Sequence, residues 1–218
     1  MRTFVCFCWL AVASAPVLAA TKAHVISFGK WQSVKLDSGT EMEPAEIRVR
    51  TLLVDGKLRE YTIGQPHDVT EHEFVVFRAV RLNDALPDEK QSRWIWQRGG
   101  WVRVDRVSGR ITPLKLPNFD PQSSAVSWYR DYVAYCGVSD DDSHVYALVI
   151  QLGMRKPILR KGLDGSIKSG SADPLCPPPV WQRKPMRVEF SIANGPNLTF
   201  TVRNRALELA TADEDDTE

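Results

Sequence analysis

Apolar and polar side chains alternate with a period of two over much of this chain. The clearest case is EIRVRTLLVDGKLREYTI, residues 46–63, in which the alternation is interrupted by Asp55-Gly56. Successive side chains of an extended strand point to opposite faces, so this period is typical of β-strands with one buried face. Asp-Gly suits the left-handed backbone angles of a two-residue hairpin loop. The segment therefore predicts a β-hairpin that turns at Asp55-Gly56.

Three other segments are apolar at both parities: EFVVFRAVRL at residues 73–82, YVAYCGV at 132–138 and VYALVIQL at 145–152. This pattern is typical of strands that are covered on both faces. A simple two-sheet sandwich would leave one face of each sheet in water. The single candidate helix, residues 83–93, contains Pro87 and is largely polar, which favours a loop. We therefore expect an all-β chain.

Glycine turns followed by short alternating strands recur along the sequence, at Gly56, Gly109, Gly153 and Gly195. Their spacing approaches the repeat of about 40 to 45 residues that is found in propeller blades of WD40 size. About sixteen short strands would fit the chain as four blades. We expect one all-β domain, residues 21–209, built as a propeller-like stack of about four antiparallel sheets. A β-sandwich and an incomplete propeller that oligomerises are the alternatives.

Two segments resemble parts of β-propeller blades of the TolB or WD40 kind. AVSWYRDYVAY, residues 125–135, is similar to the first two strands of a blade, with Trp128, Asp131 and a following apolar strand in place. Its turn is shorter and lacks the usual proline and glycine. WVRVDRVSGRITPLKL, residues 101–116, resembles the outer hairpin of a blade. The resemblance implies a propeller-type fold, and it carries over no catalytic residue.

Residues 1–20 have the pattern of a secretory signal peptide. Arg2 precedes an apolar run and a stretch of small residues, with cleavage expected after Ala19 or Ala20. The run is shorter than the roughly 20 residues that span a bilayer, although an uncleaved anchor is the alternative. Since no later stretch is long and apolar enough to be a transmembrane helix, we expect a secreted or periplasmic protein without a transmembrane segment after cleavage.

Signal cleavage would leave two cysteines, Cys136 and Cys176. In an oxidising compartment such an isolated pair is expected to form a disulfide, and two buried thiols are the alternative. The chain ends in an acidic segment, residues 210–218, in which five of the last six residues are Asp or Glu. Such a segment is expected to be a disordered, solvated tail.

The segment RWIWQRGGWVRV, residues 93–104, concentrates tryptophan and arginine. If Gly99-Gly100 forms a two-residue turn, all of these long side chains share one face of a hairpin. The expected cross-strand pairs are Arg98 with Trp101, Trp96 with Arg103 and Trp94 with Asp105. The resulting ladder could stabilise a sheet by cation–π contacts, or it could bind a glycan or an anion. The candidate ligand-binding residues are Trp94, Trp96, Arg98, Trp101 and Arg103.

A second candidate site lies in HDVTEH, which places His67, Asp68, Glu71 and His72 within six residues. These residue types supply metal ligands and acid–base groups. On a strand, however, the odd spacing of the two histidines puts them on opposite faces, and the segment matches no standard zinc motif. A polar loop that leads into the next strand is the alternative interpretation.

The common catalytic motifs are absent: the sequence has no GxSxG, HExxH, P-loop or GxGxxG. Its 28 basic and 27 acidic residues are dispersed, which disfavours nucleic-acid binding. We therefore expect a monomeric, exported binding or scaffold protein that has no cofactor and binds an envelope protein, a glycan or an anionic ligand. A secreted hydrolase that uses the His67–His72 cluster is the alternative.

Overall fold

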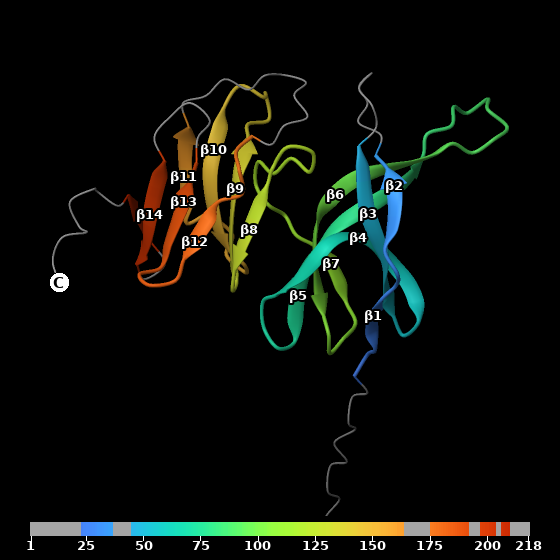
Figure 1. Ribbon diagram of the computed structural model, residues 1–218, viewed down its shortest axis with the longest axis horizontal. Helices are drawn as coiled ribbons and strands as arrows, with labels where there is room; N and C mark the ends of the chain where they lie inside the picture. The colour runs from blue at the N-terminus through green and yellow to red at the C-terminus, as the bar shows by residue number, and fades with distance from the viewer. Residues whose placement is uncertain (1–22, 37–44, 164–174, 192–196, 204–205, 210–218) are drawn as a thin grey trace, which may run out of the picture.

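The protein is all-β, as expected from the sequence. The computed structural model describes residues 23–36, 45–163, 175–191, 197–203 and 206–209, and these contain fifteen strands and no helix. The strands form three antiparallel sheets, of seven, four and four strands (Figure 1).

The first sheet has a central strand order of β3-β4-β5-β6-β7, and both β1 and β2 pair with the free edge of β3. An isolated parallel bridge between Leu36 and Trp96 brings β6 against the end of β2, so the sheet curls on itself. The predicted hairpin is confirmed, with φ of 54° at Asp55 and 74° at Gly56. The strands are β1 (Ile26–Phe28), β2 (Gln32–Lys35), β3 (Glu46–Val54), β4 (Lys57–Asp68), β5 (Glu73–Asn83), β6 (Trp94–Asp105) and β7 (Ile111–Pro113).

The second and third sheets, which we call the paired sheets, are both four-stranded meanders in which each strand pairs with the next along the chain. The predicted disulfide is confirmed: Cys136 on β9 is bonded to Cys176, which precedes β12, with 6.0 Å between their Cα atoms. The second sheet contains β8 (Val126–Tyr129), β9 (Tyr132–Val138), β10 (Val145–Gln151) and β11 (Leu159–Leu163). The third contains β12 (Val180–Gln182), β13 (Arg187–Phe190), β14 (Leu198–Arg203) and β15 (Ala206–Leu209).

The second sheet is covered by apolar side chains on both of its faces. One face, including Ala147 and Val149, packs against Phe190 of the third sheet. The opposite face, which includes Tyr135 and Leu148, packs against side chains of the segment between β7 and β8 and of β8 itself. The prediction that β9 and β10 are covered on both faces is therefore confirmed. The first sheet has a separate core, formed by Leu52, Phe74, Val76, Val102 and Val104.

The expected number of sheets is wrong for the described residues, which form three sheets instead of four, the first too large for a blade. The glycine spacing gave a wrong number of sheets because a turn glycine marks a hairpin, and a hairpin can lie at any place within a sheet. Gly109 and Gly153 both precede the last strand of their sheets, with φ of 64° and 85°, whereas Gly56 lies within the first sheet. Gly195 falls outside the described residues. So do the predicted signal peptide and the predicted acidic tail.

Candidate functional site

Gly99-Gly100 forms a β-bulge, so the predicted hairpin at this position is wrong. β6 runs without interruption past both glycines, with Arg98 opposite Ala79 of β5 and Trp101 opposite Phe77. The two glycines therefore face the single residue Arg78, which defines a bulge. A Cβ atom on Gly99 would lie 2.9 Å from Cγ2 of Val80, so the close approach of β5 requires glycine there.

The extra residue of the bulge leaves the long side chains of β6 on one face, although not in the predicted pairs. They lie opposite alternate residues of β5, from Asn83 to Glu73. The cation nearest the first two indoles is Arg81 of β5, whose guanidinium carbon lies 4.9 Å from the ring of Trp94 and 5.9 Å from that of Trp96. The long side chains therefore share one face because of the bulge, and not because of the hairpin turn that the sequence predicted.

The five predicted ligand-binding residues fall into three different surroundings. Trp94 lies on a projecting hairpin, and Trp96 lies at the base of that hairpin, where it meets Tyr61 edge-on at 4.9 Å and forms the bridge to Leu36. Arg98 contacts the segment that leads into the second sheet, and Trp101 contacts the second sheet itself. Arg103 lines a pocket on the first sheet. The five residues do not form one continuous surface.

The projecting hairpin is formed by the ends of β5 and β6. The pairing between β4 and β5 ends at Tyr61 and Ala79, so residues 80–97 continue beyond β4 as a ribbon of two strands with a tip loop, bridged at its base by Leu36, and we call this ribbon the arm. Figure 1 shows the arm reaching away from the rest of the molecule. Three large apolar side chains on it are exposed: Leu82 by 42%, Leu86 by 59% and Trp94 by 52%.

Local hydrogen bonds fix the tip of the arm. The side-chain oxygen of Asn83 accepts hydrogen bonds from the backbone N–H groups of Ala85 and Arg93, at 3.3 and 3.0 Å. The guanidinium of Arg93 forms an ion pair of 2.9 Å with Asp84. Leu86 and Glu89 close a tight turn, in which the Glu89 N–H donates to the Leu86 carbonyl at 2.9 Å. The expected loop at residues 83–93 is confirmed, and its exposed Leu86 is held in a defined position.

Aromatic rings connect the first sheet to the second; we call this contact the aromatic junction. Trp101 lies 5.4 Å from Phe77 on its own sheet and 5.1 Å from Trp128 on β8. His67 stacks on Trp128 at 5.6 Å, and its Nε2 lies 2.8 Å from the Arg130 carbonyl oxygen, to which it donates. Rings from four strands, β4, β5, β6 and β8, thus fill the contact between the sheets.

The second sheet adds a buried phenol to this region. The Tyr135 hydroxyl donates a 2.7 Å hydrogen bond to the carbonyl of Pro117, and its ring meets Phe119 edge-on. Burial raises the pKa of Tyr135 above its usual range. The phenol is therefore a fixed structural donor that stays protonated.

The structure disperses the residues of the predicted metal site. His67 belongs to the aromatic junction, Asp68 forms a 2.6 Å ion pair with Arg106, and the backbone carbonyl of Glu71 accepts from the same arginine at 3.3 Å. His72 lies in the turn before β5. Within the described ranges, no three His, Cys, Asp or Glu side chains are grouped in a way that could hold a metal ion.

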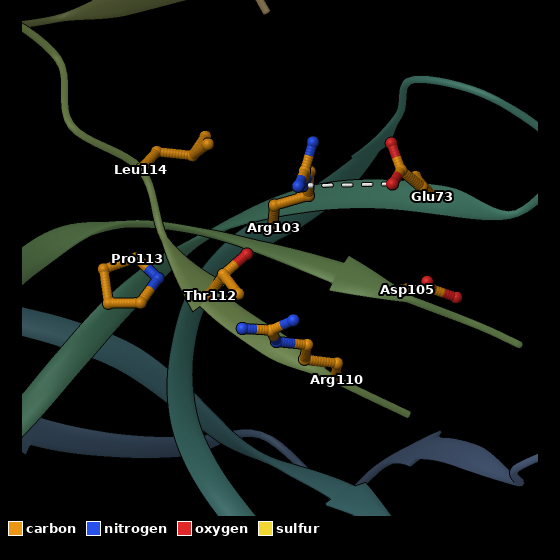
Figure 2. A pocket seen from close by; sticks show the side chains of 7 residues that line it. All are labelled: Glu73, Arg103, Asp105, Arg110, Thr112, Pro113 and Leu114. Atoms are coloured by element: carbon orange, nitrogen blue, oxygen red, sulfur yellow. Dashed lines mark ion pairs between the residues drawn. The ribbon is translucent and has the colours of Figure 1, made fainter. Parts of the chain in front are cut away.

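A pocket of about 380 Å³ lies on the face of the first sheet opposite its core (Figure 2). Asp105 accepts hydrogen bonds from the N–H groups of Val107 and Ser108, at 2.8 and 3.0 Å, and these lower the pKa of its carboxyl group. The Nε of Arg103 lies 3.9 Å from a carboxylate oxygen of Glu73. The residues that line the pocket are Glu73, Arg103, Asp105, Arg110, Thr112, Pro113 and Leu114.

Sequence reasoning identified only Arg103 among these pocket residues. A usable signal was present, since Arg103 and Asp105 alternate on one strand while Arg110 and Thr112 alternate after the Ser108-Gly109 turn. Two polar alternations that flank a tight turn predict a charged hairpin face.

No family model matches the chain, and no curated protein or solved structure shows significant similarity to it. Among the residues that the structure describes, no helix is long and apolar enough to cross a membrane.

Proposed function

We propose that this chain is an exported, non-catalytic binding protein whose arm inserts into an apolar recess of a partner protein. The observation that carries the proposal is the exposure of Leu82, Leu86 and Trp94 on one projecting, hydrogen-bonded hairpin. Large apolar side chains that are exposed together on one projecting element are candidates for an interaction surface. Tryptophan is also among the residues that contribute most to binding energy in protein interfaces.

The arm is preorganised for insertion into a partner. Leu82 lies opposite Ile95 and Trp94 lies opposite Asn83, so the exposed leucine and tryptophan point to opposite faces of the ribbon. A recess that encloses the ribbon would cover both. Because the tip is already fixed by its own hydrogen bonds, its association would lose little conformational entropy.

Charge favours a protein partner over an anionic membrane. The tip carries Asp84, Asp88 and Glu89 against Lys90 and Arg93, whereas segments that bind anionic lipid surfaces are rich in lysine and arginine. A second copy of the chain is also disfavoured, because the pocket on the first sheet is lined mainly by charged groups and is not an apolar recess that could take the arm.

The fold and location that we propose rest on further observations. The paired sheets are two successive four-stranded meanders packed face to face, the arrangement of neighbouring propeller blades. Their first strands lie together, with the Trp181 indole N–H donating to the Ser127 carbonyl at 3.2 Å. We infer a relationship to TolB or WD40 blades for these two sheets only. The disulfide and the signal-peptide pattern of residues 1–20 support export.

Site-specific photo-crosslinking tests the proposed function. A photoreactive amino acid at Leu86 in the exported chain should give one discrete protein adduct, and Trp94→Ser should abolish that adduct. The matched control is the same photoreactive group at Met154, which is 47% exposed at another hairpin turn and should not give it.

Three outcomes would contradict the proposal. The first is a set of adducts that is the same from both positions. The second is an adduct of twice the mass of the chain, which would identify a second copy as the partner. The third is labelling by lipid alone.

A further inference from the structure

The pocket on the first sheet places opposite charges in an order that a specific class of small molecule would match. Glu73 and Asp105 lie opposite each other at one end. Arg103 lies opposite Thr112 in the middle, and Leu114 follows where its N–H donates to the Trp101 carbonyl at 2.8 Å. Figure 2 shows the same order, with the two carboxylates at one end and Pro113 and Leu114 at the other.

The charges within the pocket are incompletely paired. The ion pair between Arg103 and Glu73 is long, at 3.9 Å, and the Arg103 side chain remains 40% exposed. Arg110 is exposed, and its guanidinium makes no hydrogen bond or ion pair to another described residue. Its backbone carbonyl accepts from the Asp105 N–H at 2.9 Å, and its N–H donates to the Ser108 hydroxyl at 3.4 Å. Asp105 uses one carboxylate oxygen to cap its turn, which leaves the other oxygen able to accept a donor. The pocket therefore keeps both cationic and anionic groups available.

This mixture discriminates against singly charged ligands. A simple anion would be attracted by Arg103 and Arg110 but repelled by Glu73 and Asp105. A simple cation would be attracted by the two carboxylates but repelled by the two arginines. A molecule that carries an ammonium and a carboxylate satisfies both pairs, and charge-assisted bonds of this kind are the stronger hydrogen bonds in proteins.

The strand geometry sets the spacing of the backbone positions that carry the two kinds of charge, although the long side chains bring Arg103 Nε within 3.9 Å of the Glu73 carboxylate. Asp105 and Arg103 are two residues apart on β6, which corresponds to about 7 Å along a strand. The level of Leu114 is two residues further, because it bonds to Trp101. An α-amino acid holds its two charges closer together than this, whereas the termini of an extended dipeptide are separated by a comparable distance.

We propose that this pocket binds a zwitterionic dipeptide with an aliphatic C-terminal residue. Glu73 and Asp105 accept the N-terminal ammonium, Arg103 and Arg110 bind the terminal carboxylate, and Leu114 and Pro113 contact the aliphatic side chain. The site is separate from the arm and does not depend on its partner.

Isothermal titration calorimetry on the mature chain tests the proposal with three matched ligands. Glycyl-leucine should bind, whereas N-acetyl-glycyl-leucine, which lacks the ammonium, and glycyl-leucinamide, which lacks the carboxylate, should bind at least about tenfold more weakly. Equal affinity for all three ligands would overturn the zwitterion assignment. An absence of binding by glycyl-leucine up to about 10 mM would overturn the site.

Two substitutions locate the binding. Arg110→Gln should weaken glycyl-leucine binding about tenfold or more. Arg155→Gln, at an exposed arginine in the turn between β10 and β11, should leave the affinity unchanged. Because both arginines are exposed, both variants should keep the wild-type melting temperature. Equal effects of the two substitutions would show that binding occurs elsewhere and would overturn the assignment to this pocket.

Discussion

The first sheet and the paired sheets bury their strands in different ways. In the first sheet, three strand pairs shift register, at Leu52/Leu53, between Ile63 and His67, and between Phe77 and Ala79. The strand pairs of the paired sheets keep an even register and are joined by a buried disulfide. Long, bulged strands divide one sheet face among an arm, a junction and a pocket, whereas short, regular strands form a continuous apolar core. The first sheet therefore carries the surface features, whereas the paired sheets contribute the continuous, crosslinked core.

The largest expected effect tests whether the two regions unfold together. Phe190 in the paired sheets and Phe74 in the first sheet are both almost fully buried. Replacing either with alanine should lower the free energy of unfolding by about 3–5 kcal/mol. Since the aromatic junction joins the regions, each substitution should shift one common urea transition, followed by tryptophan fluorescence and far-UV circular dichroism. Two separate transitions would show that the regions unfold independently.

Loss of the disulfide should have the next largest effect. The double variant Cys136→Ala and Cys176→Ala should lower the free energy of unfolding by about 2–4 kcal/mol, because the unfolded chain regains the freedom that the crosslink removes. Urea unfolding under non-reducing conditions provides the measurement, with the disulfide-bonded wild-type protein as the comparison. An unchanged unfolding free energy would mean that the bond contributes no net stability to the paired sheets.

A smaller effect tests the bulge that distinguishes β6 from the strands of the paired sheets. Gly99→Ala should cost about 1–3 kcal/mol, since its Cβ would meet Val80 and the Arg78 carbonyl oxygen at 2.9 and 3.1 Å. Gly100→Ala is the matched control, because no atom lies within 4 Å of its Cβ position. This control should be neutral or stabilising by up to about 1 kcal/mol. Equal melting temperatures for the two variants would contradict the assigned bulge geometry.

The smallest effect concerns two aspartates, one in each region. Turn hydrogen bonds from Ser108 and Val107 lower the pKa of Asp105, and those from Ser139 and Ser143 lower the pKa of Asp141. A lowered folded-state pKa stabilises the fold above the unfolded value of about 3.9, and this stabilisation is lost as the pH falls through the folded-state pKa. Below about pH 4, each wild-type carboxyl should therefore lose stability that Asp105→Asn or Asp141→Asn does not lose. Urea titrations between about pH 2 and 6 provide the measurement, and parallel wild-type and variant curves would contradict the expectation.

Sequence patterns predicted local features better than contacts between distant segments. The Asp55-Gly56 hairpin followed from adjacent residues, and the double-sided burial of β9 and β10 followed from apolar residues at both parities. Gly99-Gly100 was misinterpreted because its bulge depends on β5, whose pairing with β6 the local sequence does not specify. The Trp–Arg pairs failed for the same reason, since the cation that reaches Trp94 is Arg81.

The candidate sites were only partly predictable. Trp94 and Arg103 were identified from residue type, but the arm becomes evident only where β4 stops pairing with β5. The pocket joins side chains of β5 and β6 with those of β7 and the residues flanking it, and Glu73 is 30 positions before Arg103 in the chain. Residue types indicated binding chemistry, whereas the register between strands decided which groups meet.

The bulge in β6 has a consequence for how this chain tolerates insertions and deletions. One strand presents Trp94 to the arm, Trp101 to the aromatic junction and Arg103 to the pocket, and all three lie on the same face only because two glycines oppose one residue. A substitution at any of these positions would have a local effect. Deleting one of the two glycines would keep this facing, because a single residue opposite Arg78 restores the regular period of two. Deleting both glycines would instead reverse the facing of one half of the strand relative to the other half, and so would place the arm and the pocket out of step.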